Sequence, residues 1–110
     1  MIDWQDFEKI DMRTGTILEA KDFEKAKNPA YQLKIDFGKE IGIKNSSAQI
    51  TKLYKKEELI GKKIIAVVNF PPKQIANFIS ECLVLGIVLD NKEVILLTTD
   101  KLSENGKRIA

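Results

Sequence analysis

The residues best suited to chemistry lie in one stretch, Asn69–Glu81, between the apolar runs Ile64–Val68 and Leu83–Leu89. Its polar side chains can donate and accept hydrogen bonds, and its aromatic and aliphatic side chains can bury apolar surface. A loop held by two strands can carry both kinds of group into solvent, where function often resides. The stretch therefore predicts a binding loop.

Catalysis finds little support in the same residues. Ser80 stands beside Glu81 as a hydroxyl and a base, but no third group orients them. The chain has no histidine and one cysteine, so the commonest general base and the usual zinc or iron–sulfur ligands are missing. No phosphate-binding glycine motif or nucleophile elbow occurs. We expect a protein that is not an enzyme, with no metal and no cofactor.

The composition is that of a folded protein. At 110 residues, with 44% hydrophobic and 31% charged residues, we expect a single domain over 1–110. The net charge of +2 means that nucleic acid would have to be bound by a local basic patch. Cys82 is expected to be a small buried apolar residue. One cysteine, no signal peptide and no long apolar run predict a cytoplasmic protein without membrane insertion.

The N-terminal segment Ile2–Ile10 is expected to form a short helix. Asp3 is a suitable N-cap, and Asp6 follows at the third helical position, where a negative charge is favourable. Trp4, Phe7 and Ile10 share one face. Such an apolar helix is expected to pack on the body of the protein or meet a second subunit.

The rest of the chain predicts strands with one helical interruption. Asp11–Lys21 is a strand in which Gly15 suggests a bulge or a sharp bend, and Tyr31–Phe37 alternates cleanly between apolar and polar residues. A third strand starts at Ile41 and is expected to break near Asn45–Ser47. A helix is expected within Ala48–Gly61, because Gly61 is a natural stop. The ranges 63–68, 80–89 and 93–99 complete the strands.

This order predicts an all-β, five-stranded OB-fold Greek-key barrel, with the short N-terminal helix and a helix between strands three and four. The insertion of a helix after the third strand is the plan of that fold. A plain β-sandwich is the alternative, but it does not account for the position of the helical pattern.

Three runs resemble the CsaA family: Asp11–Ile17, Ile41–Thr51 and Ala66–Lys73. The runs Ser-Ser-Ala-Gln-Ile-Thr and Val-Val-Asn-Phe-Pro-Pro carry most of the resemblance, which extends from about Phe7 to Ile109. CsaA is a secretion-related chaperone within the wider tRNA-binding OB-fold group, which includes the C-terminal extension of many methionyl-tRNA synthetases. The resemblance implies an OB-fold homodimer that binds unfolded or pre-secretory polypeptides and is linked to the export machinery.

Peptide binding is the first functional hypothesis. An exposed apolar surface framed by polar groups would suit an extended polypeptide. The residues expected to provide it are Phe70, Pro71, Ile75 and Phe78. The alternative is that Phe70, Ile75 and Phe78 fill the end of the barrel or a dimer interface.

Binding of tRNA is the second hypothesis. The wider group binds the tRNA elbow through the loop that begins here at Asn69, and Asn69, Pro72, Lys73 and Ser80 match the group's pattern. Cys82 and Leu83 replace a glycine and a methionine of that pattern, which favours peptide over tRNA. The expected tRNA contacts are Lys44, Ser46, Ser47, Lys52, Asn69, Lys73, Asn77 and Ser80.

A homodimer is implied by the resemblance to the CsaA family. Trp4, Phe7 and the apolar strand Val94–Leu97 offer more apolar surface than a barrel of this size needs. We expect Trp4, Phe7, Val94 and Leu96 to lie at the dimer interface.

Overall fold

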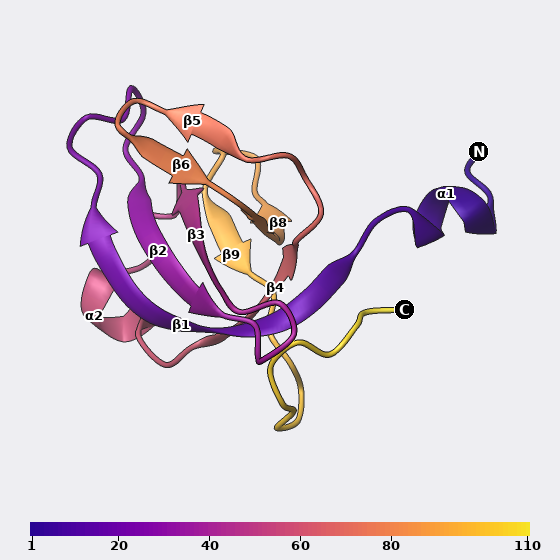
Figure 1. The fold of residues 1–110 in the computed structure, drawn as a ribbon. Coiled ribbons are helices and arrows are strands. Elements are labelled where there is room, and N and C mark those ends of the chain that lie inside the picture. Colours follow the sequence, from indigo (N-terminus) through magenta and orange to yellow (C-terminus); the bar gives the residue numbers. More distant parts are fainter.

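The computed structural model describes all residues 1–110 and shows a five-stranded antiparallel sheet curled into a nearly closed barrel (Figure 1). The strand order is β3-β2-β1-β4-β7, and the strands are β1 Met12–Asp22, β2 Tyr31–Asp36, β3 Ile43–Ala48, β4 Lys63–Val67 and β7 Leu83–Val84. Two hairpins accompany the sheet: β5 Lys73–Ile75 with β6 Phe78–Ser80, and β8 Gly86–Val88 with β9 Val94–Leu96. The helices are α1 Trp4–Glu8 and α2 Lys56–Leu59. The predicted OB-fold barrel is confirmed.

β1 is the central strand and organises the sheet. It pairs with β4 from Met12↔Val67 to Thr16↔Lys63, and with β2 from Thr16↔Asp36 to Asp22↔Tyr31. A bulge or a sharp bend was predicted at Gly15, but the register shift lies between Ile17 and Glu19, and the pairing with β4 is regular through Gly15. Gly15 is needed for packing instead, because a Cβ there would lie 2.8 Å from the Ile35 side chain.

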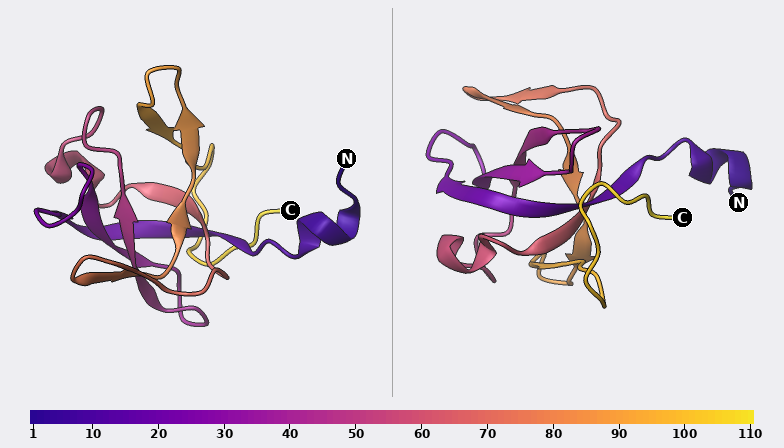
Figure 2. Two further views of the ribbon diagram at one scale, coloured as in Figure 1. Left: turned by 90° about the horizontal axis from the view of Figure 1, so that it is seen from above. Right: turned by 60° about the horizontal axis from the view of Figure 1, so that its bottom comes forward.

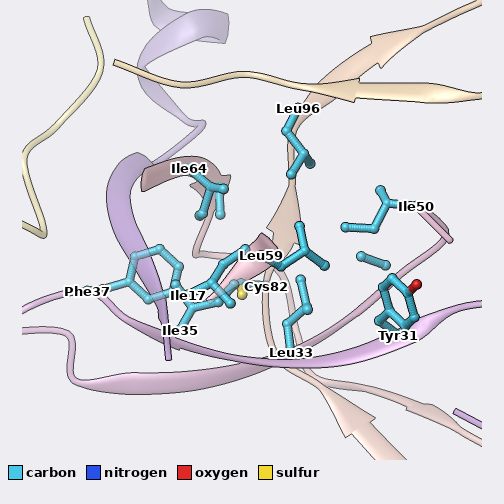
Figure 3. Packing of buried hydrophobic residues seen from close by; sticks show 12 residues of the cluster. Ile17, Tyr31, Leu33, Ile35, Phe37, Ile50, Leu59, Ile64, Cys82 and Leu96 are labelled. Carbon is cyan, nitrogen blue, oxygen red and sulfur yellow. The ribbon is translucent and has the colours of Figure 1, made fainter. Parts of the chain in front are cut away.

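The alternating residues of β2 face the barrel interior, as predicted. Tyr31, Leu33 and Ile35 are buried, and Phe37 continues the row just beyond the strand (Figure 3). They belong to a cluster of 12 buried residues that also contains Cys82. Burial raises the pKa of the Cys82 thiol to about 11, so this residue behaves as the small apolar side chain that was expected.

The helix predicted within 48–61 is limited to Lys56–Leu59. Tyr54 accounts for this correction, because Tyr31 Oη donates to its carbonyl at 2.7 Å and its own hydroxyl accepts from the Leu96 N–H at 2.9 Å. These two bonds hold Tyr54 to Tyr31 of β2 and Leu96 of β9, which fixes its position independently of any helix. Lys55, the next residue, has extended backbone. The helix ends at Leu59, because Ile60 already has extended backbone, and Gly61 follows with φ +86.

Two strand predictions also change. β3 continues through Asn45–Ser47, because each of these residues pairs with β2 and the Ser46 hydroxyl donates to the Cys82 carbonyl at 2.9 Å. The strand predicted over 80–89 is divided between β6, β7 and β8. The division occurs where the chain changes partner: the Leu85 N–H donates to Ile65, whereas the Leu85 carbonyl accepts from Leu97.

Both termini lie on the same side of the barrel, and α1 stands away from it (Figure 2). The predicted N-cap is confirmed: Asp3 Oδ1 accepts from the Asp6 N–H at 2.8 Å, and Asp6 Oδ2 accepts from the Asp3 N–H at 3.1 Å. The C-terminal tail runs beside the start of β1, with the Ile109 N–H donating to Met12 at 2.9 Å. Neither helix has the length and apolar character needed to cross a membrane.

Candidate binding loop between β4 and β7

The segment 69–81 is an ordered hairpin, β5–β6, that lies against β3 (Figure 1). Its register pairs Lys73 with Ser80 and Ile75 with Phe78. Ala76 in the turn has φ 53, a left-handed conformation that is uncommon for a residue with a side chain. The loop expected from sequence therefore contains a two-stranded antiparallel hairpin, whose side chains point alternately to two opposite faces.

Two side chains fasten this hairpin to the edge of β3. Ser80 Oγ accepts from the Ser47 N–H at 3.0 Å, and the Glu81 carboxylate accepts from the Asn45 N–H at 2.9 Å. The Glu81 N–H in turn donates to the Asn45 carbonyl at 2.8 Å. These bonds close the barrel between β3 and β7, which are not paired with each other in the sheet. Ser80 and Glu81 are thus engaged with backbone groups rather than with each other.

The inner face of the hairpin packs on the loop that joins β1 to β2. The Phe78 and Phe23 rings meet edge to face, with centroids 5.4 Å apart, and Phe23 is buried. Ile75, opposite Phe78 in the ladder, is half-buried, whereas Ile79 on the other face is 53% exposed. Phe70, before the hairpin, is 54% exposed, and Pro71 is also exposed.

A groove of about 180 Å³ lies between Phe78 and the outer face of β1, β2 and β3. Its other lining residues are Glu19, Lys21, Gln32, Leu33, Lys34 and Asn45. Lys34 Nζ lies 3.2 Å from Glu19, so one positive charge of the groove is partly balanced. This face and its two adjoining loops form the surface with which OB-folds bind chain-like ligands. The groove therefore offers an aromatic wall, two amides and lysine side chains to a ligand.

Sequence reasoning missed Gln32 and Lys34, although a signal was present. Both are the outward residues of the strand whose alternation was recognised, so they had to face away from the core. What the alternation does not show is which other element lies over them.

The predicted tRNA contacts are divided by the structure. Lys73 and Ser80 are ladder partners, and Ser47 bonds Ser80, so these three gather at the hairpin. Ser46 is fully buried, which removes it from any surface contact. Lys44 pairs with Ile35 and so belongs to the opposite face of β3 from Ser47.

Two further predicted tRNA contacts lie outside that group. Lys52 lines a separate cavity beside Pro29 and Asn91. Asn77 is exposed in the hairpin turn.

The Asn69 side chain is exposed but makes two hydrogen bonds within the protein. Its Nδ2 donates to the Lys9 carbonyl at 2.7 Å, and its Oδ1 accepts from the Asp11 N–H at 3.0 Å. A tRNA contact by Asn69 would have to use the second amide hydrogen or the second oxygen lone pair, which these two bonds leave free.

Comparison with known proteins decides the family. Residues 12–108 match the family model described as "Putative tRNA binding domain". Two crystal structures cover the whole of this chain with a TM-score of 0.94: a CsaA chaperone protein from Picrophilus torridus at 64% identity, and the chaperone CsaA from Bacillus anthracis strain Ames at 51%. They are covered over 100% and 99% of their own lengths. The chain belongs to the CsaA family, within the tRNA-binding domain group.

The wider group is represented by methionine–tRNA ligases. That of Methanocaldococcus jannaschii is 36% identical over 108 residues, which are 98% of this chain but only 16% of the ligase. A MetRS-related protein from Pyrococcus horikoshii is 27% identical with a TM-score of 0.88, and the match covers 100% of this chain and 98% of that protein. The CsaA-family chain thus corresponds to a small part of the curated ligases.

The residues predicted for a dimer interface of this CsaA-family chain occupy two places. Trp4 is 80% exposed and Phe7 half-buried, and both line a cavity of about 570 Å³ with Ile2 and the C-terminal Ala110. In the other place, Leu96 is buried in the core and Val94 half-buried.

The apolar residues that β8 and β9 expose are Ile87, Val88 and Ile95, which sequence reasoning did not select. The hairpin that carries them projects from the barrel (Figure 2, left). Leu96 is only 8% exposed and points into the core, so it cannot contact a partner, whereas its neighbour Ile95 is 40% exposed and can.

Proposed function

We propose that this protein is a CsaA-type chaperone that binds unfolded or pre-secretory polypeptides in the cytoplasm and serves protein export without catalysis. The observation that carries the proposal is the pairing of exposed apolar side chains with a polar groove at one hairpin. Phe70 and Ile79 are each about half exposed, and Phe78 of the same segment lines a groove that contains Gln32 and Asn45. The 64% identity to the CsaA chaperone protein of Picrophilus torridus supports the same function.

The chemistry of an unfolded chain fits this surface. Such a chain presents apolar side chains together with unpaired backbone N–H and C=O groups. Phe70, Pro71 and Ile79 offer apolar contact, while the amides of Gln32 and Asn45 offer hydrogen bonds that do not depend on the ligand's sequence. Covering the exposed half of one large apolar side chain contributes about 1 kcal/mol. Several weak contacts of this kind suit a chaperone that must also release its ligand.

A homodimer would double this surface. We propose that α1, through Trp4 and Phe7, and the β8–β9 hairpin, through Ile95 and its neighbours, form the contact between two copies. Both elements project from the barrel and leave apolar side chains wholly or partly exposed within one copy. Two linked sites would raise the apparent affinity for a long unfolded chain that reaches both.

Polypeptide binding is tested with a fluorescently labelled, reduced and carboxymethylated α-lactalbumin, which stays unfolded. Ile79→Ala and Phe70→Ala are each expected to weaken binding about fivefold, the effect of removing part of an apolar contact. Leu102→Ala is the matched control, because Leu102 is fully exposed and lies outside the loop. Equal affinities for all three variants and the unchanged protein would remove the hairpin from the peptide site.

Binding of tRNA is the alternative, and the match to the tRNA-binding domain family supports it. Lys73 on the hairpin and Lys21 and Lys34 in the groove are placed to meet phosphates. Filter binding of tRNA across a salt series tests this function, because each phosphate contact adds to the slope. Lys73→Ala should reduce the slope by about one, whereas Lys92→Ala, in the β8–β9 turn, should leave it unchanged. No measurable binding at low salt would contradict the alternative.

A further inference from the structure

The Asn69 carboxamide bonds the linker between α1 and β1 in the way that a peptide group would. The β1–β4 ladder ends with Met12 opposite Val67, and the next residue, Val68, donates its N–H to the Asp11 carbonyl at 2.8 Å. Asn69 then uses its side chain: Oδ1 accepts from the Asp11 N–H and Nδ2 donates to the Lys9 carbonyl. The side chain thereby prolongs the ladder toward α1 by imitating backbone.

Helix α1 has few other attachments. It has five residues, none of them buried, and a helix of that length is not stable on its own. Its C-terminal carbonyls are capped from two sides, because Arg108 Nη2 donates to Glu8 at 3.1 Å and Asn69 donates to Lys9 at 2.7 Å. The position of α1 thus depends on polar bonds at its C-terminal end and not on packing against the barrel.

Asn69 is also the first residue of the binding loop, directly before Phe70. We infer that Asn69 is a positioning residue that couples the binding loop to α1, and that it does not itself contact the ligand. A polypeptide that settles on Phe70 holds the backbone of Asn69, and the side chain of Asn69 then holds Lys9 and Asp11. The inference rests on the proposed function for its two ends, the polypeptide site and the α1 dimer contact. Bound polypeptide should therefore strengthen the dimer formed through α1. By linkage, dimer formation must then strengthen polypeptide binding by the same factor.

The two hydrogen bonds of Asn69 to Lys9 and Asp11, called the Asn69 clamp below, can be tested without any ligand. Trp4 in α1 is the chain's one tryptophan and therefore reports on the helix alone. Fluorescence anisotropy of Trp4 reports the mobility of α1, and it is recorded where sedimentation shows a single species. Asn69→Ala is expected to lower this anisotropy clearly. Asn69→Asp keeps the acceptor for the Asp11 N–H but loses the donor to the Lys9 carbonyl, so this variant should also have a lower Trp4 anisotropy. Asn77→Ala is the control: Asn77 is exposed in the same loop, and it should leave the anisotropy unchanged.

The coupling is tested by sedimentation with and without saturating carboxymethylated α-lactalbumin. In the unchanged protein the polypeptide should tighten the dimer by a factor of about five, and in Asn69→Ala this factor should approach one. A role confined to stability would not change that factor.

Three results would overturn the inference. The first is an unchanged Trp4 anisotropy in Asn69→Ala. The second is an unchanged coupling factor. The third is a loss of polypeptide affinity with the anisotropy intact, which would make Asn69 a ligand contact. If the unchanged protein bound no polypeptide, the proposed function would fail, and the anisotropy of Asn69→Ala would still support or overturn the clamp.

Discussion

Glu81 and Asn45 form a reciprocal pair across the seam of the barrel. The Glu81 carboxylate accepts from the Asn45 N–H at 2.9 Å, and the Glu81 N–H donates to the Asn45 carbonyl at 2.8 Å. One residue therefore satisfies both edge-facing backbone groups of Asn45, which a neighbouring strand would otherwise satisfy. The pair fixes where the β5–β6 hairpin leaves the barrel, and hence the geometry of the candidate groove.

The first prediction concerns this pair. Glu81→Ala leaves the half-buried Asn45 N–H without its acceptor, so the free energy of unfolding should fall by about 1–2 kcal/mol. Glu81→Gln keeps an acceptor oxygen and should cost clearly less. Urea denaturation measures both, with Glu57→Ala on the exposed side of α2 as a control. Equal losses for Ala and Gln would show that the hydrogen bond contributes nothing.

The second prediction concerns Gly15. Gly15→Ala places a Cβ 2.8 Å from both the Ile35 and the Phe37 side chains. Overpacking of this kind should destabilise the protein by about 1–3 kcal/mol. Gly61→Ala is the comparison: its φ of +86 strains an alanine, but nothing lies within 4 Å of the new Cβ. Thermal melts measure the loss of stability in both variants. The near-UV circular dichroism spectrum of the folded protein should show loosened core packing only for Gly15→Ala.

The third prediction concerns Cys82 and alkaline pH. Burial raises the pKa of this thiol from 9.0 to about 11, so the folded protein holds a proton that the unfolded chain releases between these values. Stability contributed by the thiol is complete below pH 9 and is lost as the pH rises toward 11. The free energy of unfolding should fall by about 2 kcal/mol over this range. Cys82→Ala, followed by urea denaturation at each pH, should lack that decrease.

The fourth prediction concerns the contact between Phe23 and Phe78, which holds the hairpin on the β1–β2 loop. A double-mutant cycle with Phe23→Leu and Phe78→Leu should give a coupling energy of about 0.5–1.5 kcal/mol. Replacing Phe7 instead of Phe78 provides a distant pair that should be additive. A coupling near zero for Phe23 and Phe78 would mean that the edge-to-face geometry adds nothing to burial.

Local pattern was sufficient for much of the fold. The alternation from Tyr31 to Phe37 identified the core face of β2, and Asp3 and Asp6 identified the start of α1. Both signals work because the partners lie within a few residues of each other. The apolar spacing from Ile50 to Leu59 misled for the opposite reason: Tyr54 is bonded to Tyr31 and Leu96, and these distant partners overrule a local helical pattern.

Residue types and near-neighbour spacing were enough to predict the barrel, and the resemblance of three sequence runs was enough to predict the family. They could not predict which loop residues face outward and which are already occupied, because that depends on the folded arrangement. Asn69 bonds Lys9 and Asp11 across about sixty positions of chain, and Ser46 bonds the Cys82 carbonyl across 36. A polar residue that is free to bind a ligand and one that is satisfied by a distant backbone look the same in sequence, because hydrogen bonds over such separations leave no local periodicity.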